Sequence, residues 1–233
     1  FIGRGEADRM QPLTDGIKEL MEYLSPLVAQ KVALPVDEND LLSVLASGEK
    51  TGALTRDEVI ADAILLLLAG HETTINLICN GTLAFTQHPD QWKLLKDAPF
   101  QDPDTIVRAT EECLRYDPPV KSIQRIASED VELGGKTIKK DDRVRWIIPS
   151  ANRDPEKFDN PDTMDITRWP NPHVAFGAGV HHCLGATIAR VEGQEVFRAL
   201  AERFPNMEVR PHEPEYRPTM ALRSMTSLPV SLN

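Results

Sequence analysis

Residues 176–185 read Phe-Gly-Ala-Gly-Val-His-His-Cys-Leu-Gly, and this stretch decides how the chain is interpreted. Three glycines surround a single cysteine, Cys183, and the pattern that follows predicts a helix from Leu184 to about Arg203. Backbone N–H groups and the helix dipole favour negative charge at the start of a helix. The local sequence therefore predicts a tight turn that can hold a thiolate.

Other interpretations of this cysteine have to be weighed. A single cysteine before a helix is usually an inert buried residue. With His181 and His182 it could bind zinc, although no second cluster supplies the missing ligands at normal spacing. A nucleotide-binding loop is excluded, because His182 stands where the third glycine is required. We expect Gly177 and Gly179 to leave room for a flat ligand against the backbone, and Gly185 to allow a close approach of the helix.

Outward from this stretch, the chain carries mainly helical patterns and a few short strands. The expected helices span 13–34 with a break at Pro26, 40–47, 54–87, 89–96, 104–116 and 184–203. The expected strands span 123–127, 131–133 and 143–148, with one or two edge strands near the C-terminal end. Residues 99–103 are expected to form a loop, and residues 149–182 an irregular segment long enough to be functional. The expected fold class is mainly α with small β-sheets.

Composition narrows the classes of function. The chain has 233 residues, 41% of them hydrophobic, and a formal charge of −10, which argues against nucleic acid as a partner. Three scattered cysteines indicate a reducing compartment, and cytoplasm is the default expectation. The longest apolar run, 63–69, is far shorter than the roughly 20 residues that span a bilayer, so no membrane is expected. Because the chain opens at Phe1, we expect a fragment.

The stretch at 176–185 resembles the cysteine-ligand loop of the cytochrome P450 family, Phe-x-x-Gly-x-x-x-Cys-x-Gly. Phe176, Gly179, Cys183 and Gly185 match this pattern, and His181 matches the form common in bacterial members. The resemblance implies that Cys183 binds the iron of haem (iron protoporphyrin IX). It implies the cytochrome P450 fold over 1–233, but only its C-terminal portion, with the N-terminal helices missing.

A second match lies inside the long helix expected at 54–87, which is apolar on most faces and should be central. Residues 69–74 read Ala-Gly-His-Glu-Thr-Thr. Thr73 stacks over Ala69 and Gly70, and its hydroxyl can take the Ala69 carbonyl out of the helical ladder and open a groove. In the family this groove holds dioxygen against the haem, and Glu72 and Thr73 would help to deliver protons. The alternative is an irregular buried helix; a zinc-protease motif is excluded, because Ile75 stands four residues after the histidine.

A third match is Glu112-x-x-Arg115 on the helix at 104–116. By itself this is a surface pair worth well under about 1 kcal/mol. The resemblance implies a buried network in which Arg168, from the irregular segment, joins the pair and fixes the loop that carries Cys183. Cys79 and Cys113 match nothing functional and are expected in the core.

A fourth match, residues 118–125, resembles the strand that passes the haem. The resemblance implies that Arg125 and His181 bind the haem propionates. It also implies a substrate pocket, and ordinary strand residues remain the alternative. The expected pocket residues are Val120, Ser122, Ile123, Met220, Ala221 and Leu222. The expected haem contacts are Phe176, Gly177, Gly179, Gly185, Ala69 and Gly70.

The implied activity is insertion of one oxygen atom of dioxygen into a small organic substrate. Because no reductase, flavin or iron–sulfur motif is visible, two electrons are expected from a ferredoxin and its ferredoxin reductase. One alternative is a peroxide-driven haem-thiolate enzyme. Another is a truncated, non-catalytic haem-binding remnant or one part of a split enzyme, which would associate with the missing N-terminal half or with itself.

Overall fold

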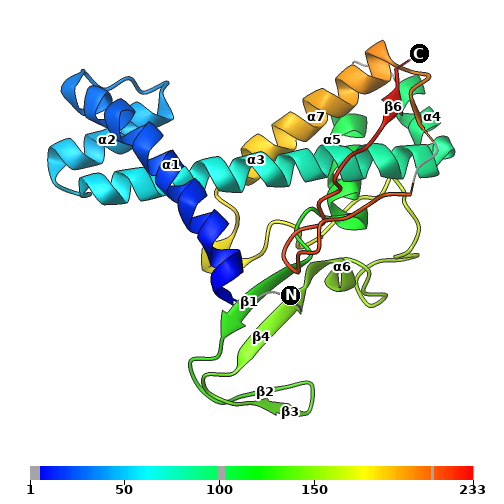
Figure 1. The fold of residues 1–233 in the computed structure, drawn as a ribbon. Coiled ribbons are helices and arrows are strands. Elements are labelled where there is room, and N and C mark those ends of the chain that lie inside the picture. Colours follow the sequence, from blue (N-terminus) through cyan, green and yellow to red (C-terminus); the bar gives the residue numbers. More distant parts are fainter. Residues whose placement is uncertain (1–5, 99–102, 211–212, 233) are drawn as a thin grey trace. The chain divides into compact units, whose positions relative to one another are not determined.

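The computed structural model describes residues 6–98, 103–210 and 213–232, and the chain divides into two compact units, residues 1–71 and 72–233. Helices dominate both units, and the described strands form only two-stranded sheets, so the expected class, mainly α with small β-sheets, is confirmed. Figure 1 shows the elements in chain order. The loop expected at 99–103 lies, apart from Pro103, outside the described residues.

The first unit contains α1 (Glu6–Ala33), α2 (Leu41–Thr51) and the first turns of α3 (Arg56–Gln87). Asp40 caps α2, because its carboxylate accepts the N–H groups of Leu42 and Ser43 at 2.9 and 3.3 Å. α3 begins after a capping box: Glu58 accepts the N–H of Thr55 at 2.7 Å. The buried side chains that hold the unit together are Leu24, Val28, Val59, Ile60 and Ile64.

The break expected at Pro26 is wrong, because α1 continues through it as one helix. A proline inside a helix costs about 3 kcal/mol, since it removes one N–H donor and crowds the preceding turn. Leu24 and Val28, on either side of Pro26, are 8% and 0% exposed. Burial of this apolar face stabilises the helix enough to outweigh the proline.

Within the first unit, α3 exposes part of its apolar surface. Leu65, Leu67 and Leu68 are 62%, 51% and 52% exposed. By length and composition α3 is apolar enough to cross a membrane, although a core helix of a soluble protein passes the same test.

The second unit is built around the last turns of α3, with α4 (Pro89–Asp97), α5 (Pro103–Tyr116) and α7 (Ala186–Arg203). Their buried side chains form one core in which the rings of Phe85 and Phe197 meet edge to face, 5.5 Å between centroids. Close helix packing depends on glycine: a Cβ on Gly193 would lie 3.0 Å from Thr110 and 3.1 Å from Leu77. Glycine is therefore needed where α7 passes α5 and α3.

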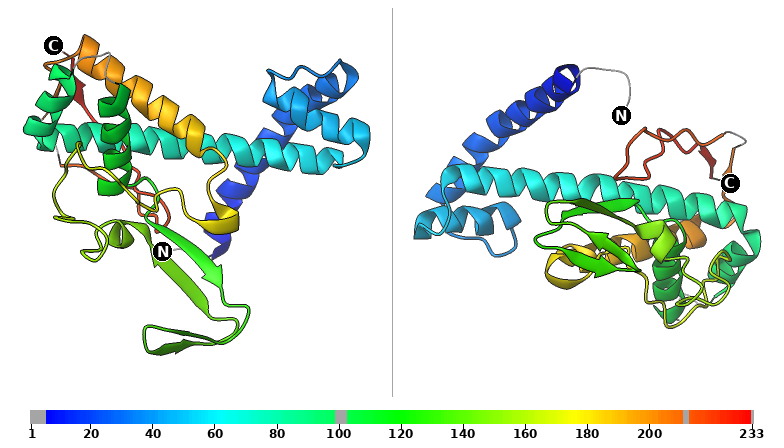
Figure 2. Two further views of the ribbon diagram at one scale, coloured as in Figure 1. Left: turned by 180° about the vertical axis from the view of Figure 1, so that it is seen from behind. Right: turned by 90° about the horizontal axis from the view of Figure 1, so that it is seen from below.

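Three antiparallel pairs complete the second unit. β1 (Ser122–Ile126) pairs with β4 (Arg143–Ile147), and β2 (Val131–Leu133) pairs with β3 (Lys136–Ile138) in a hairpin that extends from their end (Figure 2). The strand β3 was not expected. β5 (Glu208–Val209) pairs with β6 (Val230–Ser231), as expected for edge strands.

The segment expected to be irregular, 149–182, contains little regular structure. α6 (Ile148–Ala151), which was not expected, leads into it, and a single 3-10 turn over Gly179–His181 ends it. Between them the backbone is held mainly by side chains, as described below. The segment is therefore ordered by specific hydrogen bonds, without a helix or sheet of its own.

Candidate functional site around Cys183

The turn before α7 places Cys183 at the surface with its backbone fixed. Its N–H donates to the carbonyl of Phe176 at 2.9 Å, and the N–H of His182 donates to the carbonyl of Gly179 at 3.0 Å. Gly177 and Gly179 have φ of +71° and +70°, which side-chain-bearing residues rarely adopt. The glycines expected to leave space for a ligand are thus also required by the turn itself.

Cys183 differs from the other two cysteines in its surroundings. Burial raises the pKa of the Cys79 thiol and raises that of Cys113 far more. Cys183 is exposed, three residues before the first residue of α7. A zinc interpretation gains no support, because no group of three His, Cys, Asp or Glu side chains suited to a metal occurs among the described residues. Cys183 is the thiol that an external ligand can reach.

Exposed apolar side chains stand on both sides of Cys183 in the sequence. Val180 and Leu184 are 98% and 89% exposed, and Ile188 and Val191 continue this surface along α7 at 65% and 52%. The close approach expected at Gly185 is not seen: a Cβ there would meet no described atom within 4 Å. An exposed thiol among exposed apolar side chains suits a flat, apolar ligand that is bound through sulfur.

Glu112 and Arg115 form a buried pair on α5. Both side chains are 0% exposed, and Arg115 Nε and Nη2 donate to the two oxygens of Glu112 at 2.8 Å each. The remaining N–H groups of Arg115 reach backbone carbonyls of the irregular segment at 2.7 to 3.0 Å. These carbonyls belong to Asn152, Pro161 and Thr163.

Arg168 joins this pair from the irregular segment. Its Nε lies 3.3 Å from Glu112 Oε2 as an ion pair, and its guanidinium also donates to the carbonyl of Asp159 at 2.8 Å. Glu112 further accepts the N–H of Asp165 at 2.8 Å and the amide of Asn171 at 3.0 Å. One carboxylate therefore fixes the segment that leads to Cys183 at several points.

Glu72 lies at the start of the second unit and is held by two residues that sequence reasoning missed. The hydroxyl of Ser224 donates to Glu72 Oε1 at 2.8 Å, and the amide of Asn76 donates to Ser224 Oγ at 2.8 Å. Ser224 and Asn76 are each 2% exposed. α3 continues through residues 69–74 without interruption, and the groove expected near Thr73 stays a prediction.

The two segments expected to form the pocket lie together. Val120 pairs with Leu222, the N–H of Lys121 donates to the carbonyl of Ala221 at 2.7 Å, and Ser122 Oγ donates to the carbonyl of Met220 at 2.8 Å. Ile123 of β1 lies 3.9 Å from the position that a Cβ on Gly177 would take, which brings β1 beside the cysteine loop.

The two residues expected at the propionates, Arg125 and His181, lie on β1 and in the 3-10 turn. Arg125 donates to the carbonyl of Gln124 at 2.9 Å and lies 6.0 Å from the centre of the Trp146 ring. His181 is exposed. Neither side chain forms an ion pair among the described residues, so the guanidinium of Arg125 and the ring N–H of His181 are available to an external anion.

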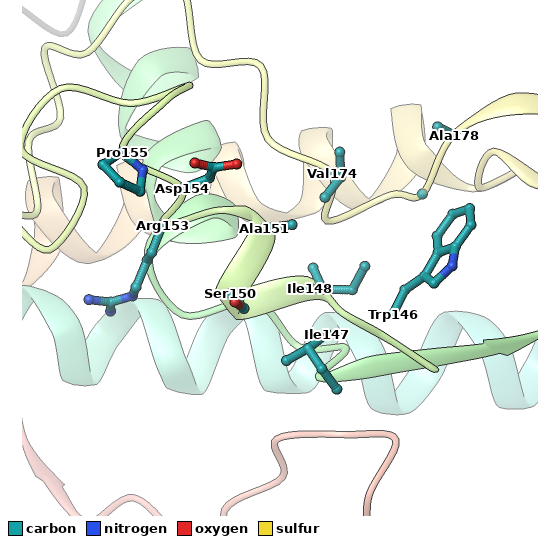
Figure 3. A pocket seen from close by; sticks show the side chains of 11 residues that line it. Trp146, Ile147, Ile148, Ser150, Ala151, Arg153, Asp154, Pro155, Val174 and Ala178 are labelled. Atoms are coloured by element: carbon teal, nitrogen blue, oxygen red, sulfur yellow. The ribbon is translucent and has the colours of Figure 1, made fainter. Parts of the chain in front are cut away.

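A cavity of about 710 Å³ lies between α6 with β4 and the segment that precedes Cys183 (Figure 3). Trp146 and Ile148 point across it toward Ala178 and Val174. Gly177 is the one residue of the expected haem contacts that lines it, and the residues expected at the substrate pocket do not.

Three further residues near Cys183 were missed. His173, Glu111 and Arg190 meet in one cluster, with Arg190 Nε 2.7 Å and His173 Nε2 3.1 Å from the Glu111 carboxylate. Burial alone would raise the pKa of Glu111, but hydrogen bonds from His173 and Arg190, together with the charge of Arg190, outweigh it and lower the pKa to about 2. No local signal marks this cluster, because its members are 62 and 79 residues apart from Glu111 in sequence.

Comparison with known proteins identifies relatives of the whole chain. The family model described as "Cytochrome P450" matches residues 106–230. The chain is 42% identical over 213 residues to the "Biotin biosynthesis cytochrome P450" of Bacillus subtilis (strain 168), covering 91% of this chain and 52% of that protein. It is 42% identical over 218 residues to the "Vitamin D(3) 25-hydroxylase" of Pseudonocardia autotrophica, covering 92% and 53%.

A solved structure gives the same result for the fold. The chain matches the Bacillus subtilis 168 bacillaene polyketide synthase cytochrome P450 PksS with a TM-score of 0.88 and 40% identity, over 99% of this chain and 59% of that one. The chain spans about half the length of the curated relatives it matches.

Proposed function

The chain belongs to the cytochrome P450 family, and from this premise we propose that it forms the thiolate-bearing part of a haem monooxygenase, with Cys183 as the ligand of the haem iron. The observation that carries the proposal is the loop itself. Cys183 is exposed among apolar side chains, its backbone is bonded to Phe176, and two glycines with positive φ shape the turn.

The residues present fit a haem. The exposed apolar surface of Val180 and Leu184 suits the face of a porphyrin, and Arg125 supplies a cation and His181 a ring N–H donor for its propionates. When bound, a thiolate-ligated haem supplies the redox-active iron that activates dioxygen. The remaining roles belong to side chains of this chain.

Glu72 and Thr73 are proposed to move protons. Of the two carboxylate oxygens of Glu72, only Oε1 accepts a hydrogen bond from a described residue, Ser224, so the other oxygen can accept and release a proton while this one is anchored. Asn76 fixes the Ser224 hydroxyl from its other side. This arrangement favours a dioxygen-dependent reaction over a peroxide-driven one, which has less need of a proton relay.

The substrate and the partners are part of the same proposal. The paired segments at Val120–Ile123 and Met220–Leu222 would line the pocket for a small organic substrate. Two electrons would come from a ferredoxin and its reductase, docking near the Cys183 face, in the cytoplasm. Nucleic acid is not proposed as a partner, because the chain carries a charge of −10.

A second candidate is one part of an assembled enzyme. Leu184, Ile188 and Val191 form an exposed apolar stripe at helical spacing, and such surface favours association. Sedimentation of the purified chain tests this candidate. Self-association, or assembly with a chain that supplies the part of the relatives' length that residues 1–233 do not span, is expected; a stable monomer that binds no haem would contradict both candidates.

The proposed function is tested by the absorption spectrum of the reduced, carbon monoxide-treated chain after reconstitution with haem. Thiolate ligation is expected to shift the Soret band strongly to the red. Cys183→Ser should abolish this shift, and Cys79→Ser, which changes a thiol inside α3, should keep it. An unshifted band in the wild-type chain, or the same spectrum in Cys183→Ser, would overturn the proposal.

A further inference from the structure

Two neighbouring acids on α5 hold the segment before Cys183 at alternate residues. Glu112 binds Asn171 at 3.0 Å, and Glu111 binds His173 at 3.1 Å. The first acid belongs to the network with Arg115 that the family resemblance implies. The second acid, with His173 and Arg190, forms a separate cluster with different partners.

Each side chain in this second cluster is held by hydrogen bonds. Arg190 donates to both oxygens of Glu111, at 2.7 and 3.0 Å, which is the bidentate geometry of a strong pair. His173 is 2% exposed, and its Nδ1 accepts the N–H of Ala175 at 3.2 Å. Because Nδ1 accepts, Nε2 carries the proton and donates to Glu111. The histidine ring is therefore locked in one tautomer and one orientation.

The cluster surrounds the ring of Phe176. The guanidinium carbon of Arg190 lies 4.5 Å from the ring centre, within cation–π distance, and the ring of His173 lies 6.1 Å away at a tilt of 49°. Phe176 in turn accepts the N–H of Cys183 through its carbonyl at 2.9 Å. A continuous path of contacts thus leads from Glu111 through Arg190 and Phe176 to the cysteine.

We infer that Glu111, Arg190 and His173 are positioning residues for Cys183, acting through the ring of Phe176. Glu111 orients Arg190 and His173, these two residues hold the ring, and the ring holds the carbonyl that fixes the cysteine backbone. Arg190 lies seven residues after Cys183 on α7, so the same cluster ties both sides of the cysteine turn to α5. The consequence for haem ligation rests on the proposed function.

Hydrogen exchange tests the positioning role without haem. In Glu111→Gln we expect the Cys183 amide to exchange about tenfold faster, the effect of losing one charged hydrogen bond. Glu195→Gln removes the same charge from an exposed pair with Arg198 on α7 and should leave the Cys183 amide unchanged. Equal exchange of the Cys183 amide in Glu111→Gln and wild type would overturn the inference.

A double-mutant cycle with Phe176 separates an effect on the position of Cys183 from a general loss of stability. Arg190→Lys keeps the positive charge but loses the planar group on the ring, so it should also speed exchange at Cys183. In a Phe176→Leu background the ring is gone, and Arg190→Lys should then have little further effect. An Arg190→Lys effect of the same size in both backgrounds would contradict action through Phe176.

The spectrum of the haem-bound, carbon monoxide-treated variants supplies the second readout. Glu111→Gln and Arg190→Lys should lose part of the red-shifted band to an unshifted one, because the thiolate is held less firmly. If the wild-type chain itself lacks the red-shifted band, the proposed function fails, and hydrogen exchange alone decides the positioning role. If the wild type shows the band and both variants retain it in full, the inference about ligation is overturned.

Discussion

Replacing Glu112 with glutamine keeps the size of the side chain and removes its charge. Each oxygen of Glu112 accepts two hydrogen bonds: Oε1 from Arg115 and Asp165, and Oε2 from Arg115 and Asn171. A glutamine must place its NH₂ group at one of these positions, whichever way the amide turns. In the variant, the NH₂ group of the glutamine therefore faces two N–H donors. The side chain of Arg115, which is 0% exposed, also loses its counter-charge.

The expected cost follows from this geometry. Breaking a buried pair by removing one partner costs about 3–5 kcal/mol. A natural domain is stable by about 5–15 kcal/mol, so the second unit should lose a large share of its unfolding free energy. With a urea dependence of about 2 kcal/mol per M, the unfolding midpoint should fall by about 2 M.

Tryptophan fluorescence measures this change in the correct unit. Trp92, Trp146 and Trp169 are the only tryptophans of the chain, and all three lie in the second unit. Urea unfolding followed by their emission should show the fall in Glu112→Gln. Glu195→Gln, whose carboxylate is 62% exposed, should change the unfolding free energy by less than about 0.5 kcal/mol.

The reasoning would be refuted if Glu112→Gln changed the unfolding free energy by no more than Glu195→Gln does. Such a result would mean that the carboxylate charge contributes nothing to holding the irregular segment, and that packing alone orders it.

Further predictions concern other parts of the chain. Because the pKa of Glu111 is lowered to about 2, its contribution to stability is complete above about pH 4.5 and is lost as the pH falls toward 2. Urea unfolding should show that the unfolding free energy falls by about 3 kcal/mol over this pH range. In Glu111→Gln the unfolding free energy should depend less on pH over the same range. Gly177→Ala should cost about 1–2 kcal/mol because φ is +71°, whereas Gly185→Ala, with φ of −86° and open space around it, should cost nothing by the same assay. Pro26→Ala should stabilise α1 by up to about 3 kcal/mol, seen as slower hydrogen exchange over residues 6–33; unchanged exchange would contradict the account of that helix.

Sequence reasoning succeeded where the cause of a structure is local. The starts of the helices expected at 40 and 54, and the tight turn at the glycines around Cys183, depend on residues a few positions away. These features could be placed to within a few residues before any contact was known.

Sequence reasoning failed where contacts between residues far apart in sequence determine the local structure. Pro26 continues a helix because Leu24 and Val28 are buried, and Ile148 at the start of α6 is also buried. Glu112 and Arg115 alone would be a surface pair, and only the burial of α5 makes them the anchor of the irregular segment.

The cluster of Glu111, His173 and Arg190 was missed for the same reason, since its members come from three separate parts of the chain. The expected substrate pocket and proton relay are neither confirmed in full nor contradicted: their residues are placed, and their roles are untested. The structure brings Val120 beside Leu222 and holds Glu72 through Ser224, and their roles stay predictions.

The central claim is that the sulfur of Cys183 binds the haem iron, and X-ray absorption at the iron edge tests it directly. The ferric haem complex of the wild-type chain should show one sulfur neighbour in the first coordination shell of the iron, and the Cys183→Ser complex should show only nitrogen or oxygen. A wild-type complex whose iron has only nitrogen or oxygen neighbours, or a sulfur neighbour that persists in Cys183→Ser, would contradict the claim.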